Sequence, residues 1–256
     1  MKLATWNVNS IRVRLPQVLA WLMREKPDIL CLQETKITDE EFPAAEFRDA
    51  GYLSIYAGQK TYNGVATISR NPAGEIVASL SGADTAQKRF LAASIDGVRV
   101  VNVYVPNGEE VDSEKYNFKL VWLEALENFL KEELRAHSKL VLLGDFNIAP
   151  EPRDVHDPQV WEGQVLFSEK ERAAFQRLIQ CGLVDVFRQF DQPPMSFSWW
   201  DYRAGAFRRN NGLRIDHIMC SPALASECSG CRIDRAPRSH ARPSDHAPVM
   251  VEFRMA

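Results

Sequence analysis

Hydrophobic residues in this 256-residue chain gather in short runs of strand length, separated by polar and amphipathic segments. Runs that are apolar at consecutive positions and rich in Val, Ile and Leu are typical of strands buried between other layers. The predicted strands are Leu3–Val8, Ile29–Leu32, Val65–Ile68, Val98–Val105, Leu140–Leu143, Leu213–Met219 and Val249–Phe253. An Asp96-Gly97 pair ahead of one of them predicts a hairpin turn.

Helical periodicity fills several of the intervals between these runs. Ile11–Met23 is amphipathic, and Ser113–Leu134 carries a long apolar stripe. Ser168 and Glu171 form a capping-box pattern that begins a further helix, and Gly182 ends it. Strands interspersed with helices, without a linker or a repeat, predict one α/β domain over residues 1–256 in which packed sheets are covered by helices.

Composition narrows the class of protein. The chain is 45% hydrophobic and 25% charged, which is typical of a globular protein, and it has no apolar run long enough to cross a bilayer. Because no export signal is visible, we expect a cytoplasmic protein, associated with the nucleoid if the source is bacterial. We also expect it to be a monomer and to bind no membrane. Five cysteines fit reduced thiols. Cys228 and Cys231, with Cys220 and His217, also suggest a zinc or redox site, but a second ligand pair is missing.

The charges are unevenly distributed along the chain, whose net charge is −3. Residues 201–245 hold eight arginines against five acidic residues, so this stretch is +3 and the remainder is −6. A basic face on an acidic protein can bind a phosphate backbone, because such contacts act over roughly 10 Å. These arginines fit a DNA contact and an ordinary solvated surface equally well.

Carboxylate and amide side chains recur where the apolar runs end or begin. The residues in such positions are Asn7, Asn9, Glu34, Asp145, Asn147, Asp216, Asp245 and His246. A buried ionised carboxylate costs several kcal/mol unless it is paired or bound to a metal. Acids at several strand ends therefore predict a shared cation.

Oxygen ligands suit Mg²⁺ or Mn²⁺ far better than zinc. The candidate ligands are Glu34, Asp145 or Asp245, with the amides of Asn7 and Asn147. Asp216 can orient His246 to hold a phosphate or to exchange a proton. Because no Walker phosphate loop, HExxH zinc helix or GxSxG nucleophile elbow occurs, the pattern predicts a metal-dependent hydrolytic site.

Six sequence blocks carry a further signal. They are Trp6–Ser10, Leu32–Lys36, Asn102–Gly108, Gly144–Pro150, Gly212–Asp216 and Pro243–Pro248. In this order they resemble the signature blocks of the exonuclease III family of apurinic/apyrimidinic (AP) endonucleases, and they span nearly the whole chain. That family lies in the endonuclease/exonuclease/phosphatase superfamily. The resemblance implies a DNase I-like four-layered α/β sandwich, in which two packed mixed sheets are flanked by helices.

The resemblance also implies roles for the residues at the strand ends. Glu34 is expected to be the principal metal ligand, with Asn7 and Asp245 near the ion. Asp145, oriented by Asn147, is expected to align or to deprotonate the attacking water. The implied reaction is a metal-assisted in-line displacement without a covalent enzyme intermediate.

The remaining catalytic roles fall on three residues. His246, paired with Asp216, is expected to contact the scissile phosphate, and Tyr104 to stabilise its developing charge.

Asn9 stands where some relatives have Asp. Asp157 stands where relatives often have Asn, and we leave it out of the site.

The resemblance further implies a pocket for a flipped-out abasic sugar, whose missing base makes extrusion cheap. Trp199 and Leu213, the latter in place of a Trp in relatives, are the expected pocket residues. Trp200 and Tyr202 fit core aromatics at least as well. The expected substrate and backbone contacts are Asn107, Lys60, Tyr62, Asn63, Arg203 and Arg208, several of which equally fit a solvated surface.

We therefore expect a DNA repair nuclease that uses Mg²⁺, with Mn²⁺ as a substitute, on double-stranded DNA containing abasic sites or blocked 3′ ends. It would cleave 5′ to the abasic site, leave a 3′-hydroxyl, and have 3′-phosphodiesterase and 3′–5′ exonuclease activity. An alternative keeps this chemistry but acts on blocked 3′ ends with little abasic-site cleavage, or on a phosphodiester outside nucleic acids. The segment Glu151–Phe167 is expected to decide between these substrates. A third interpretation is a non-catalytic DNA-binding module, against which the costly acid cluster argues.

Overall fold

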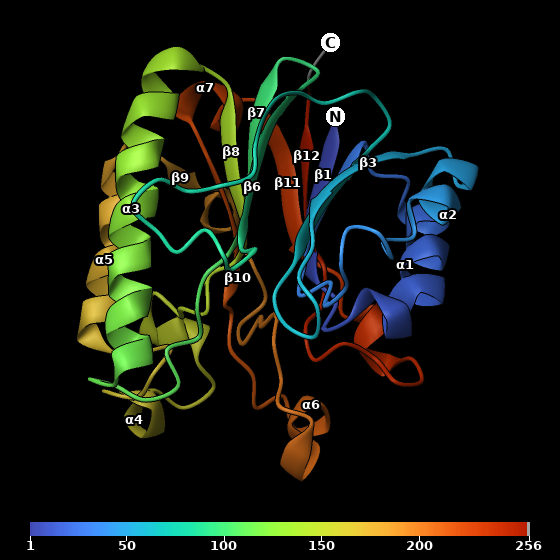
Figure 1. The fold of residues 1–256 in the computed structure, drawn as a ribbon. Coiled ribbons are helices and arrows are strands. Elements are labelled where there is room, and N and C mark those ends of the chain that lie inside the picture. Colours follow the sequence, from blue (N-terminus) through green and yellow to red (C-terminus); the bar gives the residue numbers. More distant parts are fainter. Residues whose placement is uncertain (255–256) are drawn as a thin grey trace.

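Two six-stranded sheets pack face to face in the computed structural model, which describes residues 1–254 (Figure 1). The first sheet has the order β11 (Cys228–Ile233), β12 (Val249–Phe253), β1 (Lys2–Asn7), β2 (Ile29–Gln33), β4 (Val65–Ser69) and β3 (Leu53–Ala57). The second sheet has the order β5 (Gly74–Val77), β6 (Phe90–Ile95), β7 (Val98–Tyr104), β8 (Leu140–Asp145), β10 (Asp216–Cys220) and β9 (Val184–Asp185).

Each sheet has one parallel pair of strands at its centre. β1 is parallel to β2 and β7 is parallel to β8, whereas the other pairings are antiparallel. Parallel neighbours end at the same edge, so Asn7 lies beside Gln33, and Tyr104 lies beside Asp145. Polar residues that end these strands therefore gather at one end of the sandwich.

Helices form the two outer layers. α1 (Ile11–Glu25) and α2 (Ala44–Asp49) cover the first sheet, while α3 (Glu114–Ala136) and α5 (Glu169–Gln180) cover the second (Figure 1). The shorter helices are α4 (Pro158–Trp161), α6 (Ala206–Arg209) and α7 (Pro222–Ala225). Within residues 1–254, each helix is too short or too polar to cross a membrane. The predicted four-layered α/β sandwich is thus confirmed.

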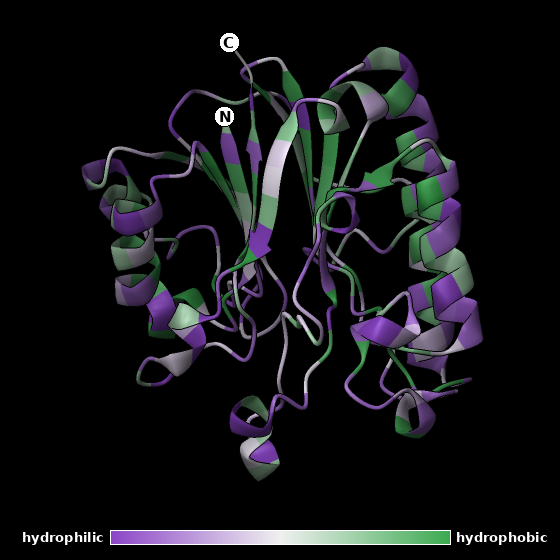
Figure 2. Ribbon diagram, turned by 180° about the vertical axis from the view of Figure 1, so that it is seen from behind, coloured by the Kyte–Doolittle hydropathy of each residue, from purple (hydrophilic) through white to green (hydrophobic). Residues whose placement is uncertain are grey.

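Alternating side chains of the strands build three apolar layers. Leu3 and Ile29 point between the sheets and pack with Leu143, whereas Trp6 faces the helices of the first sheet. On the opposite side, Trp122 of α3 packs against the outer face of the second sheet. Because both faces of the central strands are buried, their sequences are apolar at consecutive positions, and these strands are largely green in Figure 2.

A buried polar bridge joins the two sheets. Gln33 Nε2 donates to Thr5 Oγ1 at 2.9 Å and to Asn102 Oδ1 at 2.8 Å, and Asn102 Nδ2 donates to the Ala66 carbonyl at 2.9 Å. Gln33 and Asn102 have no exposed surface. A polar network in which the partners satisfy one another favours a single arrangement, so this bridge fixes how the sheets face each other.

Several local sequence predictions are confirmed. Asp96 and Gly97 connect β6 to β7 with positive φ values of 50° and 75°, as a tight hairpin turn requires. Ser168 and Glu171 form the reciprocal capping box that begins α5. Gly182, with a φ of 108°, follows the last turn of that helix.

The main difference from the predicted strands lies ahead of β10. The predicted strand Leu213–Met219 begins only at Asp216, because Leu213 forms isolated bridges with Val155 and Trp199 instead of joining the sheet. The edge strands β3, β5, β9 and β11 are not among the predicted strands, and β6 was expected only as the partner of β7 in the hairpin. The exposed faces of β5 and β11 break the apolar runs by which the buried strands were recognised.

Candidate active site

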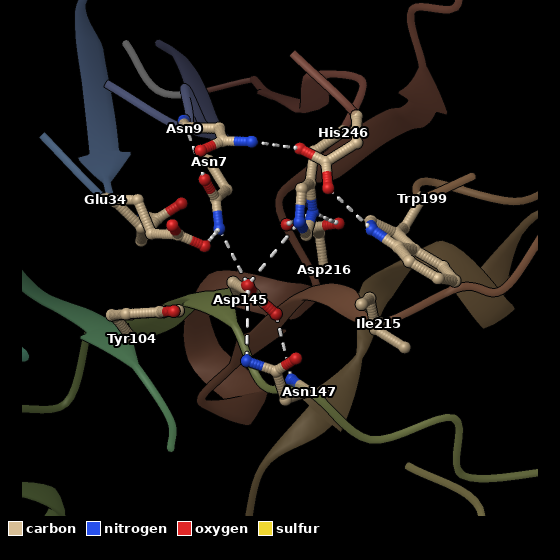
Figure 3. A network of polar contacts seen from close by, with 12 residues as sticks. Asn7, Asn9, Glu34, Tyr104, Asp145, Asn147, Trp199, Ile215, Asp216 and His246 are labelled. Atoms are coloured by element: carbon tan, nitrogen blue, oxygen red, sulfur yellow. Dashed lines mark hydrogen bonds and ion pairs between the residues drawn. The ribbon is translucent and has the colours of Figure 1, made fainter. Parts of the chain in front are cut away.

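Acidic and amide residues from both sheets meet at one end of the sandwich (Figure 3). Asn7 ends β1 and Glu34 follows β2, whereas Asp145 ends β8 and faces Asp216 across the β8–β10 pairing. His246 lies just before β12. The structure therefore brings together the strand-end residues that the sequence pattern singled out.

Three of these residues could share a cation. One ligand atom each of Glu34, Asp145 and His246 lies within 4.8 Å of the other two. Asn7 Nδ2 bridges the carboxylates, donating to Glu34 Oε1 at 2.7 Å and to Asp145 Oδ2 at 2.9 Å. Its own oxygen accepts the backbone N–H of Asn9. Carboxylate oxygens suit Mg²⁺, so the donor set fits an ion held chiefly by Glu34 beside Asp145, with Asn7 holding the two carboxylates in place.

Asp245 is connected to this cluster through other side chains. Its Oδ1 accepts from Asn9 Nδ2 at 3.0 Å, and its Oδ2 accepts from Trp199 Nε1 at 3.0 Å. Asn9 Oδ1 in turn accepts from Lys36 Nζ at 2.5 Å, and Lys36 pairs with Glu34 at 2.8 Å. Both oxygens of Asp245 are thus engaged, and its role as a metal ligand stays a prediction.

Asp145 is buried, with 1% of its surface exposed. Burial raises the pKa of Asp145 to about 7, although the nearby His246 opposes the shift. Asn147 fixes the carboxylate, because its backbone N–H donates to Asp145 Oδ1 at 2.9 Å, and Asn107 Nδ2 donates to Asn147 Oδ1 at 3.1 Å. A carboxylate that titrates near neutral pH can align water or accept its proton.

His246 is held by Asp216. Its Nδ1 lies 2.9 Å from Asp216 Oδ2, and its Nε2 lies 3.7 Å from Asp145 Oδ2. Burial lowers the pKa of His246, but Asp216 and Asp145 outweigh burial and raise it to about 10. The ring is therefore protonated at neutral pH, and both nitrogens are donors. Ser198 Oγ accepts the backbone N–H of Asp216 at 3.0 Å, and sequence reasoning missed this serine because it stands among aromatic residues.

Tyr104 ends β7 beside Asp145. Burial raises the pKa of Tyr104 well above its usual value, and the charges of Glu34 and Asp145 add to the rise. Arg89 stacks over the ring, 4.5 Å from its centroid. The phenol consequently keeps its proton and can donate a hydrogen bond into the site.

The predicted pocket residues differ in exposure. Trp199 is half-buried beside Asp245, whereas Leu213 has no exposed surface and packs with Leu166 and Phe167. The contact of Leu213 with a substrate therefore stays a prediction.

The predicted contacts to a DNA backbone lie on the surface, except for Asn63, which is only 7% exposed. Tyr62, Asn63 and Asn107 line one cavity of about 410 Å³. Lys60 is exposed, as are Arg203 and Arg208 on the segment around α6, which protrudes from the body in Figure 1. Arg203 also pairs with Asp201 at 2.7 Å.

Known proteins share this architecture. The family described as Endonuclease/Exonuclease/phosphatase matches residues 4–246. The chain is 35% identical to exodeoxyribonuclease III of Haemophilus influenzae, over 99% of this chain and 100% of that protein.

Two solved structures superpose on the whole chain. A 3′ phosphatase (NExo) from Neisseria, bound to a product DNA hairpin, matches with a TM-score of 0.98 at 47% identity, covering 100% of both chains. An AP endonuclease from Archaeoglobus fulgidus matches with a TM-score of 0.96 at 41% identity, again over 100% of both chains. The chain belongs to the endonuclease/exonuclease/phosphatase family and is a phosphodiesterase of the exodeoxyribonuclease III and AP endonuclease type.

Proposed function

We propose that this protein uses Mg²⁺, or Mn²⁺ in its place, to break the bond between phosphorus and a 3′ oxygen in duplex DNA, leaving a 3′-hydroxyl. The observation that carries the proposal is the bridged carboxylate pair, Glu34 and Asp145, facing the His246–Asp216 pair. The same bond is broken in removing a 3′-phosphate, in releasing a 3′-terminal nucleotide, and in cutting 5′ to an abasic site.

The side chains divide the work of this hydrolysis. Glu34 would hold the Mg²⁺, whose charge would offset that of the phosphate and of the leaving oxygen. Asp145, held by Asn147, aligns the water or takes its proton as the water oxygen joins phosphorus and the 3′ oxygen leaves to become a hydroxyl. His246, oriented by Asp216, donates to a phosphate oxygen, and Tyr104 donates where charge develops.

Blocked 3′ ends are the substrate that the observations favour. The Neisseria 3′ phosphatase is 47% identical to this chain over its whole length. In addition, Leu213 and Phe167 have no exposed surface beside Trp199, and Leu166 is only 5% exposed. A flipped-out sugar needs free volume, which these side chains fill, whereas the removal of a 3′-phosphate requires no extruded nucleotide.

Incision at abasic sites is the second candidate. It is favoured by the archaeal AP endonuclease, which is 41% identical with a TM-score of 0.96. It is also favoured by Trp199, whose partly exposed ring lies beside the site.

Three duplexes separate the candidates: one with a 3′-phosphate at a nick, one with an abasic site, and an intact one. Each is incubated with the protein in Mg²⁺ and in EDTA, and the end groups of the products are identified. We expect the 3′-phosphate to be removed at least about tenfold faster than the abasic strand is cut, with no product in EDTA. Faster abasic cutting would favour the second candidate, and no metal-dependent product from any duplex would refute the shared chemistry.

A further inference from the structure

A lysine ammonium is buried directly behind the proposed active site. The side chain of Lys119, on α3, has 0% exposure. Lys119 occupies one position of the buried stripe of this helix, whose other members include Tyr116, Leu123, Leu126 and Leu130. A charge in such a position is costly unless each of its donors is paired.

All three donors of Lys119 have acceptors. Nζ donates to the Asn107 carbonyl at 3.0 Å, to the Asn147 carbonyl at 2.6 Å, and to the carboxylate of Glu171, which is also fully buried. The two carbonyls belong to the loops that follow β7 and β8. The ammonium therefore ties together the loops of two neighbouring parallel strands.

These loops carry the groups that orient Asp145. The Asn147 backbone N–H donates to the Asp145 carboxylate, and the Asn107 amide donates to that of Asn147. Asn147 has a φ of 49°, a left-handed conformation that surrounding contacts must maintain. The bond from Lys119 to the Asn147 carbonyl is one such contact.

The surrounding chain is shaped to admit this lysine. Gly108 has a φ of 96°, and a Cβ at that position would lie 3.3 Å from Lys119 Cδ. Glu171 Oε1 also accepts the backbone N–H of Leu166 at 3.1 Å, and its Oε2 accepts that of Ser168 at 3.1 Å. One buried ion pair thus reaches the loop after β7, the loop after β8 and the start of α5.

We propose that Lys119 is a positioning residue that acts through Asn147 to hold Asp145 in the orientation that hydrolysis requires. The inference rests on the proposed role of Asp145. Stability alone does not account for the lysine, because replacing a buried ion pair by apolar residues is often neutral or stabilising. Two loop carbonyls that need a common donor do account for it.

The test compares Lys119→Met with a matched control, Arg99→Met. Arg99 is 3% exposed and pairs with Glu133 on the same helix, but it lies at the start of β7, at the opposite end from Tyr104. Both variants remove a buried cation from an α3 ion pair. Each is assayed for kcat and KM on whichever duplex the wild type hydrolyses, for Mn²⁺ affinity without DNA by calorimetry, and for its melting temperature.

For Lys119→Met we expect kcat to fall at least about tenfold with KM within about twofold, since small displacements of catalytic groups are costly. Its Mn²⁺ affinity should be unchanged or up to about threefold tighter, because a positive charge near Asp145 has been removed. Arg99→Met should keep kcat within about twofold of wild type, even if its melting temperature falls as much as that of Lys119→Met. Equal kcat losses in the two variants, or Mn²⁺ binding weakened in step with kcat, would overturn the proposal.

A second variant keeps the test decisive should Lys119→Met not fold. Glu171→Gln leaves both carbonyl bonds of Lys119 in place, removes the countercharge, and replaces one accepting oxygen by an amide nitrogen. Its kcat should stay within about threefold of wild type, whatever happens to its stability. A tenfold loss would assign the effect to the ion pair as a whole and contradict the role given to the carbonyls. If wild type hydrolyses none of the duplexes, the proposed function fails first, and the calorimetric comparison still tests the link between Lys119 and the acidic cluster.

Discussion

The two sheets are built alike, yet each presents its main carboxylate differently. Both place polar residues at the end of a central parallel pair, Asn7 and Glu34 in the first sheet and Tyr104 and Asp145 in the second. The Glu34 side chain is 16% exposed and paired with Lys36, whereas Asp145 is 1% exposed and burial raises its pKa to about 7. In the proposed function, the first half of the sandwich would offer Glu34 to a cation from solvent, and the second would shelter Asp145 for handling water.

The difference between the halves is tested most strongly at Asp145. Asp145→Asn keeps the shape of the side chain but removes its ability to accept a proton, so we expect kcat to fall at least about 10³-fold. The loss should persist at high Mg²⁺ concentration. DNA binding in EDTA, measured by fluorescence anisotropy, should remain within about threefold of wild type. Turnover within tenfold of wild type would remove Asp145 from the role proposed for it.

Glu34 should respond to metal where Asp145 does not. Glu34→Gln removes the carboxylate expected to be the principal ligand of the ion, so we expect about 10²-fold lower activity at low Mg²⁺ concentration. Raising Mg²⁺ should restore part of this activity, because weakened binding is overcome by mass action. Activity titrations against Mg²⁺ for both variants measure this directly. If high Mg²⁺ fails to restore activity in Glu34→Gln as well as in Asp145→Asn, Glu34 and Asp145 do not have the separate roles proposed here.

Cooperation between the halves depends on the bridge between the sheets. Asn102→Leu removes one buried acceptor from Gln33 and one buried donor from each of two main-chain carbonyls, so we expect about 3 kcal/mol lower free energy of unfolding in urea. The exposed Asn71, whose amide bonds to Asp96 at 3.0 Å, supplies the control. Asn71→Leu should change stability by about 0.5 kcal/mol or less. Similar losses in both variants would show that the bridge adds nothing beyond a surface contact.

The smallest expected effect concerns the second sheet alone. His217 is 1% exposed, and burial lowers its pKa well below the usual value, with Arg214 adding to the shift. Below about pH 6.5 the unfolded chain therefore binds a proton that the folded chain does not, so stability falls as pH falls. We expect His217 to account for about 1 kcal/mol of the loss between about pH 7 and about pH 5.5. His217→Gln, which cannot titrate, should show a shallower pH dependence in urea unfolding, and identical slopes would contradict this.

The fold and the site were predictable from the sequence to different depths. Most central strands were recognisable in the sequence, because burial on both faces makes them continuously apolar. Their ends meet because parallel neighbours finish at one edge of the sheet. Edge strands such as β5 lack this signal, since one side faces solvent. Lys119 was visible in principle as a charge inside the apolar stripe of a predicted helix. The Asn7 bridge and the support from Ser198 were not, because side-chain orientation and contacts between distant segments leave no local pattern.

The hairpin at Asp96 and Gly97 has a practical consequence. It begins β7, whereas Tyr104 ends the same strand, so at ~3.3 Å per residue the turn lies about 20 Å from the proposed chemistry. Both residues are exposed, and a Cβ built on Gly97 would meet no atom beyond its chain neighbours within 4 Å. A fluorophore or an affinity loop inserted at this turn would accordingly give the enzyme a handle for immobilisation or single-molecule work while leaving the opposite edge free to engage DNA.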